Sequence, residues 1–353
     1  MDVRTGSFRR PAAVATAALA ILAPSGLAAC GGDDDENDGE DAGGEVTLTV
    51  YSGRDEELVG PLLERYEEET GNELEVRYGE SAELAATIVE EGENSPADVF
   101  FSQDAGSLGA IQNEGLLGEL PDEVLETVDQ AFRSSEDAWV GVSGRARVLA
   151  YNTDTVQASE LPDSVLELTG TEWKGRVGWA PTNGSFQAFV TAMRLTEGED
   201  AAADWLEGMV ANETVALPDN EAARDAVAAG EVDLALINHY YVEQAREEEG
   251  DDYPVDVHFT SGGDVGSLVN VAGAGAIAGS DELDAATELV AFLLDQESQQ
   301  FFSDETKEYP LVTGVEADPD LVPLAEIQQP EVDLSNLDDL QGTLRLIEDS
   351  GAL

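Results

Sequence analysis

The chain has 353 residues, with 76 Asp and Glu against 16 Lys and Arg, and a formal net charge of −60. A surface that follows nucleic-acid phosphates needs clustered basic residues, and Lys174 and Lys307 are the only lysines, so the composition excludes nucleic-acid binding. A hydrophobic content of 42% with 35 glycines is typical of a packed globular protein of two domains or one large one. We interpret most of the acidic residues as surface solvation of a halophile-like protein, because salt screens such charges from one another.

The first 29 residues have the layout of a secretory signal peptide. A basic start (Arg4, Arg9 and Arg10) precedes an apolar stretch over residues 12–23, which is too short to span a bilayer as a stable helix. Leu27-Ala28-Ala29-Cys30 resembles a bacterial lipobox, in which the cysteine carries lipid. We therefore predict an extracytoplasmic protein attached to the cell membrane only through a lipid on Cys30. The alternatives are an ordinary signal peptide with a chance cysteine, and export by either the Sec or the twin-arginine route.

Residues 30–45 follow as a predicted acidic, flexible tether. Apart from one alanine, the segment 31–45 (GGDDDENDGEDAGGE) has no apolar side chain, and its like charges repel one another. Because Cys30 is the only cysteine, no disulfide can form within the chain.

From Val46 the hydrophobic pattern alternates between strand and helix periods. Strands are predicted over residues 46–51, 74–78 and 97–101, and helices over 57–69 and 81–91, the second capped by Ser81. In the first helix, Leu58, Leu62, Leu63 and Tyr66 form the apolar face. This β-α-β-α-β order predicts a parallel sheet, in which ligands bind beyond the carboxyl ends of the strands.

A second α/β unit is predicted further along the chain. Its strands are expected within residues 175–181 and 233–238, with helices that start after the loop 182–186 and over 221–229. The apolar Gly/Ala-rich segment 269–278 is expected to return the chain to the first unit, and residues 281–301 are expected to form one amphipathic helix. Two lobes with a hinge and a ligand cleft follow from this arrangement.

The predicted domain bounds follow from these crossings. The N-terminal lobe takes residues 46–145 and 270–320, and the C-terminal lobe takes residues 146–269 and 321–353.

Six segments in order resemble the bacterial ferric-ion-binding proteins, the extracytoplasmic solute-binding components of iron(III) ABC transporters. They are VYSGRDEE (50–57), NSPADVFFSQDAG (94–106), SGRARVLAYNT (143–153), WKGRVGWAPTNGSF (173–186), GEVDLALINHYY (230–241) and EYPL (308–311). The resemblance implies an α/β, two-lobed periplasmic-binding-protein fold of type II that closes over one ferric ion. It also implies a monomer that delivers iron to a membrane permease with ATPase subunits.

The paired Tyr240 and Tyr241 suit ferric iron on chemical grounds as well. Fe(III) is a hard cation that prefers anionic oxygen ligands, and a bound trication favours loss of the phenol proton, although the ordinary tyrosine pKa is near 10. Adjacent side chains point to opposite faces of a strand. We therefore expect the pair in a turn or a helix start after the strand over residues 233–238; the other interpretation is an aromatic pair packed in the core.

The resemblance leaves the remaining metal ligands open. Asp55 stands where some relatives have histidine, and Gln103 stands where they have glutamate. Asp55 is a candidate oxygen ligand, Gln103 is only a neutral donor, and Asp104 is expected to cap the next helix. Tyr151 comes too early in the chain to serve as the third tyrosine that some relatives have. His239 is expected to pack behind the site rather than to bind the metal.

A synergistic anion, carbonate or phosphate, is the expected source of the missing ligands. The resemblance assigns its binding to one Gly-containing loop, to two further asparagines and to two arginines: Asn183, Gly184, Ser185, Asn220, Asn238, Arg54 and Arg147. A loop that opens a helix provides backbone N–H groups for an anion, and arginine adds charged hydrogen bonds. The alternative for the arginines is an ion pair with one of the many carboxylates.

Other classes of function fit less well. GxSxG, HExxH, CxxC and P-loop motifs are absent from the sequence, so we expect no enzyme, although a hydrolase with paired carboxylates stays open. The main alternative is a binding protein of the same fold for phosphate, sulfate, a polyamine or an organic acid. An adhesive surface lipoprotein would not need a hinge. The tyrosine pair favours ferric iron.

Overall fold

The computed structural model describes residues 46–250 and 252–353; the predicted signal peptide, tether and lipidated Cys30 lie outside them. The described strands are β1 (Thr47–Ser52), β2 (Glu73–Tyr78), β3 (Val99–Ser102), β4 (Val140–Asn152), β5 (Val177–Trp179), β6 (Val215–Ala216), β7 (Leu234–Asn238), β8 (Val255–His258), β9 (Val269–Ala276) and β10 (Tyr309–Pro310). The α-helices are α1 (Glu56–Thr70), α2 (Ser81–Glu91), α3 (Ala105–Asn113), α4 (Asp122–Leu125), α5 (Gly184–Thr196), α6 (Glu199–Ala211), α7 (Asn220–Ala228), α8 (Tyr240–Glu249), α9 (Leu283–Phe292), α10 (Gln296–Thr306) and α11 (Leu340–Asp349).

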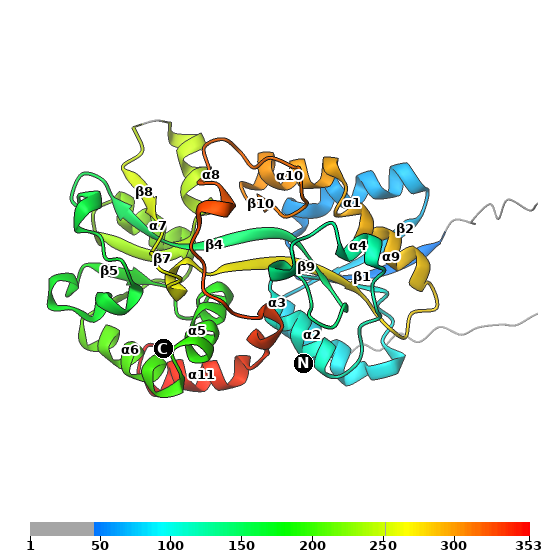
Figure 1. Ribbon diagram of the computed structural model, residues 1–353, viewed down its shortest axis with the longest axis horizontal. Coiled ribbons are helices and arrows are strands. Elements are labelled where there is room, and N and C mark those ends of the chain that lie inside the picture. Colours follow the sequence, from blue (N-terminus) through cyan, green and yellow to red (C-terminus); the bar gives the residue numbers. More distant parts are fainter. Residues whose placement is uncertain (1–45, 251) are drawn as a thin grey trace, which may run out of the picture. The chain divides into compact units, whose positions relative to one another are not determined.

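The ten strands form one mixed sheet in the order β2-β1-β3-β9-β4-β7-β5-β6, with β8 and β10 also paired to β4 (Figure 1). Its two parallel groups are β2-β1-β3 and β7-β5-β6. The long antiparallel strands β4 and β9 lie side by side between the groups. The predicted α/β class is confirmed.

The first parallel group has the predicted β-α-β-α-β order, with two local differences. In α1 the buried residues are Val59, Leu62, Leu63 and Tyr66, so Val59 takes the place predicted for Leu58, which is only half-buried. The predicted cap by Ser81 is wrong, because Ser81 is the first residue of α2 and Glu80 is the N-cap. Its hydroxyl instead accepts a hydrogen bond of 2.8 Å from the backbone N–H of Gln103, which ties the start of α2 to the end of β3.

The strand β4 passes from one parallel group to the other. Its first half pairs with β9 as far as Ala146, opposite Val269. Its second half, from Arg147, pairs with β7. The backbones pack closely here: a Cβ atom on Gly273 in β9 would lie 2.8 Å from the carbonyl oxygen of Val140, which explains the Gly/Ala-rich sequence of this strand.

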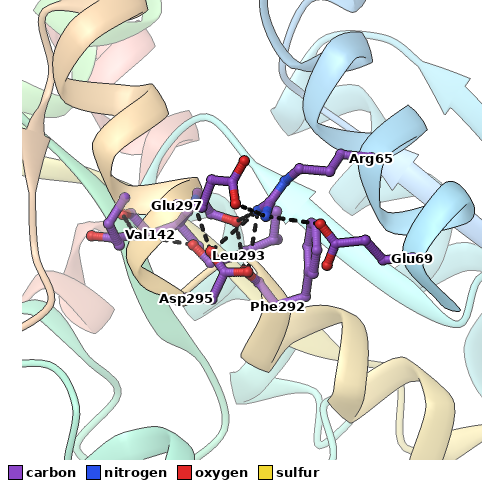
Figure 2. Close-up of polar contacts among 9 residues, drawn as sticks. Arg65, Glu69, Val142, Phe292, Leu293, Asp295 and Glu297 are labelled. Atoms are coloured by element: carbon purple, nitrogen blue, oxygen red, sulfur yellow. Dashed lines mark hydrogen bonds and ion pairs between the residues drawn. The ribbon is translucent and has the colours of Figure 1, made fainter.

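The single helix predicted over residues 281–301 is wrong, since α9 and α10 meet there at a corner. Asp295 caps α10 by accepting a hydrogen bond of 2.6 Å from the N–H of Ser298, and a capped start interrupts an otherwise continuous helical pattern. Arg65 of α1 holds the corner, with Nη2 3.1 Å from Asp295 Oδ1 and the guanidinium 4.2 Å from the centre of the Phe292 ring (Figure 2). The amphipathic period therefore predicted helical structure here but missed the break.

The C-terminal segment contacts helices of both groups. The short 3-10 helix η8 (Leu334–Asp338) lies against α3, where the carbonyl oxygens of Leu337 and Ser335 occupy the space beside Gly106 and Gly109. The following α11 packs on α5, with the hydroxyl oxygens of Thr191 and Thr343 2.7 Å apart. Within the described part of the chain, no helix combines the length and the apolar character that a membrane crossing requires.

Candidate metal centre

Tyr240 and Tyr241 are the first two residues of α8, directly after β7 and His239. Their ring centroids lie 4.2 Å apart with the ring planes tilted by 31°. Both side chains line the same cavity, which has a volume of about 980 Å³. The expected helix start is therefore confirmed, and it lets neighbouring rings share one cavity, as a strand would not.

The phenol of Tyr240 is protonated in the metal-free protein. Burial raises the pKa of Tyr240 well above its ordinary value of 10, the neighbouring Tyr241 raises it further, and the positive charge of Arg145 acts in the opposite direction. In the described residues, no group of three His, Cys, Asp or Glu is placed to hold a metal ion. Single carboxylates such as Asp55, Glu80 and Glu83 also line the cavity, but the tyrosine pair is the place where two oxygen donors come from adjacent residues.

The predicted anion loop lies at the start of α5 and is held rigidly. Asn183 caps the helix, and its Oδ1 accepts hydrogen bonds from the backbone N–H of Ser185 at 2.9 Å and from the Ser185 hydroxyl at 2.6 Å. Asn220, the first residue of α7, donates to Asn183 Oδ1 at 3.1 Å. Asn183, Gly184, Ser185, Asn220 and Asn238 all line the cavity. A Cβ atom on Gly184 would meet nothing within 4 Å, so the cavity is open at this position.

Arg147 supports this loop from behind and is not among the residues that line the cavity. Its Nη1 donates to the Ser185 hydroxyl at 3.1 Å and its Nη2 donates to the Leu236 carbonyl at 2.7 Å. Burial lowers the pKa of Arg147 to about 9, against the opposing influence of Tyr241 and Tyr240. The predicted direct role of Arg147 toward an anion is therefore not matched by its position.

Arg145 lines the cavity instead and was missed by sequence reasoning. Its side chain is 3% exposed and its Nε is buried without a hydrogen-bond partner. Among the described residues, no carboxylate lies within ion-pair distance of the guanidinium. Arg145 belongs to the same SGRAR segment as Arg147, two positions earlier in β4. The SGRAR segment therefore predicts an arginine at the site, but its sequence does not tell which of the two arginines faces the cavity.

Arg54 lines the cavity but its charge is already matched. Arg54 Nη2 lies 2.8 Å from Glu308 Oε1, and both side chains are buried. Ser143 also donates a hydrogen bond to Glu308. Burial acts to raise the pKa of Glu308, but the positive charges of Arg54 and Arg145 and the hydrogen bonds from Ser143 and Arg54 outweigh it, and the net shift is downward. Arg54 therefore forms an ion pair with a carboxylate, which was the alternative to anion binding in the sequence analysis.

Asp55 and Gln103 line the cavity from the ends of β1 and β3. Asp55 is exposed and is the N-cap residue of α1, although its side chain makes no capping hydrogen bond. Asp104 caps α3 as predicted, by accepting from the N–H of Ser107 at 2.8 Å. Tyr151 does not line the cavity, and its hydroxyl lies 3.4 Å from Asp256.

His239 faces away from this cavity, as expected, and lines a second one of about 190 Å³. Its ring is buried and stacks on Tyr309 with 4.6 Å between ring centroids. Burial lowers the pKa of His239 to about 4. The ring is therefore neutral at physiological pH.

Comparison with known proteins finds similarity to extracellular solute-binding proteins, including ferric iron-binding proteins. The family model described as bacterial extracellular solute-binding protein matches residues 62–329. The major ferric iron-binding protein of Neisseria meningitidis serogroup B is 34% identical over 309 residues, which cover 86% of this chain and 92% of that protein.

Two solved structures support the same assignment. Iron-bound HitA from Pseudomonas aeruginosa matches with a TM-score of 0.80 and 35% identity, covering 87% of this chain and 99% of that one. The Trichodesmium protein IdiA (FutA), in complex with iron and citrate, matches with a TM-score of 0.76 and 29% identity over 86% and 99% of the two chains. These matches confirm the predicted type II periplasmic-binding-protein fold. The chain therefore belongs to the bacterial extracellular solute-binding protein family.

Proposed function

We propose that this protein captures ferric iron outside the cytoplasm and delivers it to an ABC importer. The observation that carries the proposal is the placement of Tyr240 and Tyr241, whose rings share one wall of the large cavity. The relatives are named for iron binding and uptake rather than for catalysis, which supports a transport role and not an enzymatic one.

The two tyrosines would bind Fe(III) as phenolates. A phenolate is the hard, anionic oxygen ligand that a trication prefers, and the metal supplies the electrostatic gain needed to displace the phenol proton. Because burial raises the pKa of Tyr240, this residue holds its proton until the metal arrives. Iron binding is then coupled to proton release.

An anion would complete the coordination sphere. Fe(III) with two phenolates keeps one positive charge, and Arg145 adds another beside Tyr240. Buried charges need partners, so an oxyanion that contacts the metal, Arg145 and the first turn of α5 would satisfy all three. Carbonate or phosphate fits this role, and the Trichodesmium neighbour that holds iron with citrate adds a polycarboxylate as the third candidate.

The other wall of the cavity would close over the ion. Asp55 and Gln103 line it from the ends of β1 and β3, and Asp55 is the candidate oxygen ligand there. We retain the predicted lobes, residues 46–145 with 270–320 and residues 146–269 with 321–353. Ligand contacts from both lobes would shift the population toward the closed form.

The closed form would dock on a membrane permease whose ATPase supplies the energy for import. The lipid on Cys30 and the acidic tether over residues 30–45 would keep a monomeric protein at the membrane surface. These features stay proposals carried by the sequence pattern and by family membership.

A second candidate function is capture of a free oxyanion or organic acid by the same fold. Arg145, without a carboxylate partner among the described residues, and the open start of α5 favour it. A free-anion binder has no use for two adjacent phenols, however. The tyrosine pair therefore distinguishes the two candidates.

The test is titration of the mature protein with ferric nitrilotriacetate, followed by visible absorbance. We expect a tyrosinate-to-iron charge-transfer band that Tyr240→Phe with Tyr241→Phe abolishes. Tyr151→Phe is the matched control, since Tyr151 is also buried but does not line the cavity, and it should keep the band. A band that survives the double substitution, or a parent protein without any band, refutes the tyrosinate assignment.

A further inference from the structure

His239 makes three backbone and side-chain hydrogen bonds that connect separate parts of the candidate site. Its backbone N–H donates to the Ala146 carbonyl at 3.0 Å, and its ring Nδ1 accepts from the Ala146 N–H at 3.1 Å. Its ring Nε2 lies 2.9 Å from the Lys307 carbonyl. One buried residue thus contacts β4 and the end of α10, and it directly precedes the tyrosine pair.

The partners determine where the ring carries its proton. A backbone N–H can only donate and a backbone carbonyl can only accept. Nδ1 therefore faces Ala146 without a proton, and Nε2–H donates to Lys307. Both ring nitrogens are satisfied by backbone groups, so neither is free to bind a metal ion or a ligand.

Each of these backbone partners stands next to a charged group of the site. Ala146 lies between Arg145, which lines the cavity, and Arg147, which holds Ser185. Ala146 is also the last residue of β4 paired with β9, and Arg147 is the first paired with β7. The peptide that His239 holds is thus the point where β4 changes partner.

Lys307 precedes Glu308, the buried partner of Arg54. Lys307 ends α10 in the left-handed conformation, with φ of 57°, so its carbonyl direction depends on an uncommon backbone geometry. The hydrogen bond from His239 fixes this carbonyl. The ring itself lies between Tyr309, stacked at 4.6 Å, and Tyr240, edge-on at 5.9 Å between centroids.

We propose that His239 is a positioning residue that sets Arg145 against the tyrosine pair and thereby couples anion binding to iron binding. This inference rests on the proposed function. Its physical basis is that residues behind metal ligands fix their orientation, and their loss typically lowers metal affinity about 10–100-fold. The hydrogen bond to Ala146 would couple the position of Arg145 to that of the tyrosine pair. The hydrogen bond to Lys307 would hold the backbone next to Glu308, the ion-pair partner of Arg54.

Three variants separate these contributions. His239→Phe keeps an aromatic ring between Tyr309 and Tyr240 but removes both side-chain hydrogen bonds. His239→Asn places an amide oxygen near the position of Nδ1, where it can accept from Ala146. His239→Gln places its amide near the position of Nε2, where it can donate to Lys307. His258→Gln is the matched control. His258 is the other histidine of the chain, and its Nε2 also lies within hydrogen-bond distance of a backbone carbonyl, that of Pro162 at 3.0 Å. It does not line the cavity.

The experiment measures iron affinity with and without carbonate, by competition with nitrilotriacetate, together with the visible band and the melting temperature. We expect His239→Phe to keep a tyrosinate band, because both tyrosines remain, but to lose about 10-fold or more of the gain in iron affinity that carbonate gives. His239→Asn should restore most of that gain, and His239→Gln should not. If His239→Phe does not fold, the comparison of His239→Asn with His239→Gln carries the test.

The outcomes that overturn the inference differ from those that overturn the proposed function. Equal carbonate dependence in the parent and in His239→Phe, or equal loss in His239→Asn and His239→Gln, shows that the Ala146 contact does not couple the two events. A parent protein that binds iron without any gain from carbonate, phosphate or citrate also overturns it, while the iron-binding proposal stands. A parent protein that binds no iron overturns both.

Discussion

Arg54 and Glu308 form a buried ion pair, with 2.8 Å between Nη2 and Oε1, although 254 residues separate them in the sequence. The pair joins the loop after β1 to the segment before β10. It also satisfies the charge of Arg54 inside the protein. Arg145 is left as the cavity arginine without a carboxylate partner among the described residues. The electrostatic roles of Arg54 and Arg145 thus differ, although sequence reasoning assigned Arg54 and Arg147 to the anion and did not name Arg145.

Glu308→Gln should be strongly destabilising. Removal of one partner from a buried ion pair leaves the other charge unpaired, which costs about 3–5 kcal/mol. Urea denaturation of the mature protein measures the change in the free energy of unfolding. Glu297→Gln is the control, since Glu297 pairs with Arg65 on the surface with its side chain 76% exposed, and such pairs contribute about 1 kcal/mol or less. Equal losses in both variants would contradict the buried role of Glu308.

The same pair predicts a specific dependence of stability on pH. The folded-state pKa of Glu308 lies below its ordinary value of 4.5. As the pH falls below that ordinary value, the unfolded chain binds a proton that the folded protein does not, so the free energy of unfolding decreases. The stabilisation from Glu308 is therefore complete above the ordinary pKa and is lost on acidification.

Measurements of urea midpoints from pH 6 to pH 3.5 test this directly. Glu308→Gln should have a lower midpoint at pH 6 but a shallower decline toward acid than the parent. Parallel declines in the two proteins would rule out Glu308 as a source of the acid sensitivity.

The sequence predicted the parts of this fold that depend on local patterns. The strands β1, β2, β3, β5 and β7 and the helix start at Tyr240 follow from hydrophobic period and turn residues, whereas the two-residue strand β6 was not predicted. The break between α9 and α10 was missed, because Asp295 as a cap and the contact with Arg65 of a distant helix decide it. Local periodicity carries no information about such contacts.

In the candidate site, too, some residues could be predicted from the sequence and others depend on contacts between distant segments. The tyrosine pair and the asparagine loop could be located from the order of the motifs, and they line the cavity. The choice between Arg145 and Arg147 could not be made, because both lie two positions apart on β4. Only the placement of Ser185 and Leu236 beside Arg147 distinguishes a supporting arginine from one that faces the cavity.

Iron binding should release protons from the tyrosines. Because Tyr240 is protonated in the metal-free protein, each phenol that becomes a ligand gives up one proton. Titration with ferric nitrilotriacetate in weakly buffered solution should therefore release about one proton fewer per iron in Tyr240→Phe than in the parent. Tyr253→Phe, on a half-buried tyrosine away from the cavity lining, should match the parent. No difference between Tyr240→Phe and the parent would exclude Tyr240 as a phenolate ligand.

The acidic surface predicts stabilisation by salt. A formal net charge of −60 produces self-repulsion that compact folding increases, and the screening length falls from about 10 Å at 0.1 M salt to about 3 Å at 1 M. The melting temperature should rise as NaCl is added over this range. Sucrose at matched osmolality is the control for non-ionic stabilisation. A melting temperature that responds to sucrose and not to NaCl would contradict the electrostatic explanation.

Arg145→Gln and Arg147→Gln should have opposite consequences. Arg145 lines the cavity and lacks a carboxylate partner among the described residues, so its loss should remove a charged donor to the anion and lower the carbonate-dependent gain in iron affinity about tenfold. Its effect on the melting temperature should be small.

Arg147→Gln should instead destabilise the protein by about 1–3 kcal/mol, because it removes the hydrogen bonds to Ser185 and to the buried Leu236 carbonyl. Its guanidinium also lies 5.4 Å from the centre of the Phe189 ring. Urea denaturation and the carbonate-dependent iron titration, applied to both variants, separate the two roles. Arg145→Lys, which keeps a positive charge in the cavity, should recover part of the anion effect. A larger loss of anion dependence in Arg147→Gln than in Arg145→Gln would reverse the assignment and place the anion behind the loop at the start of α5.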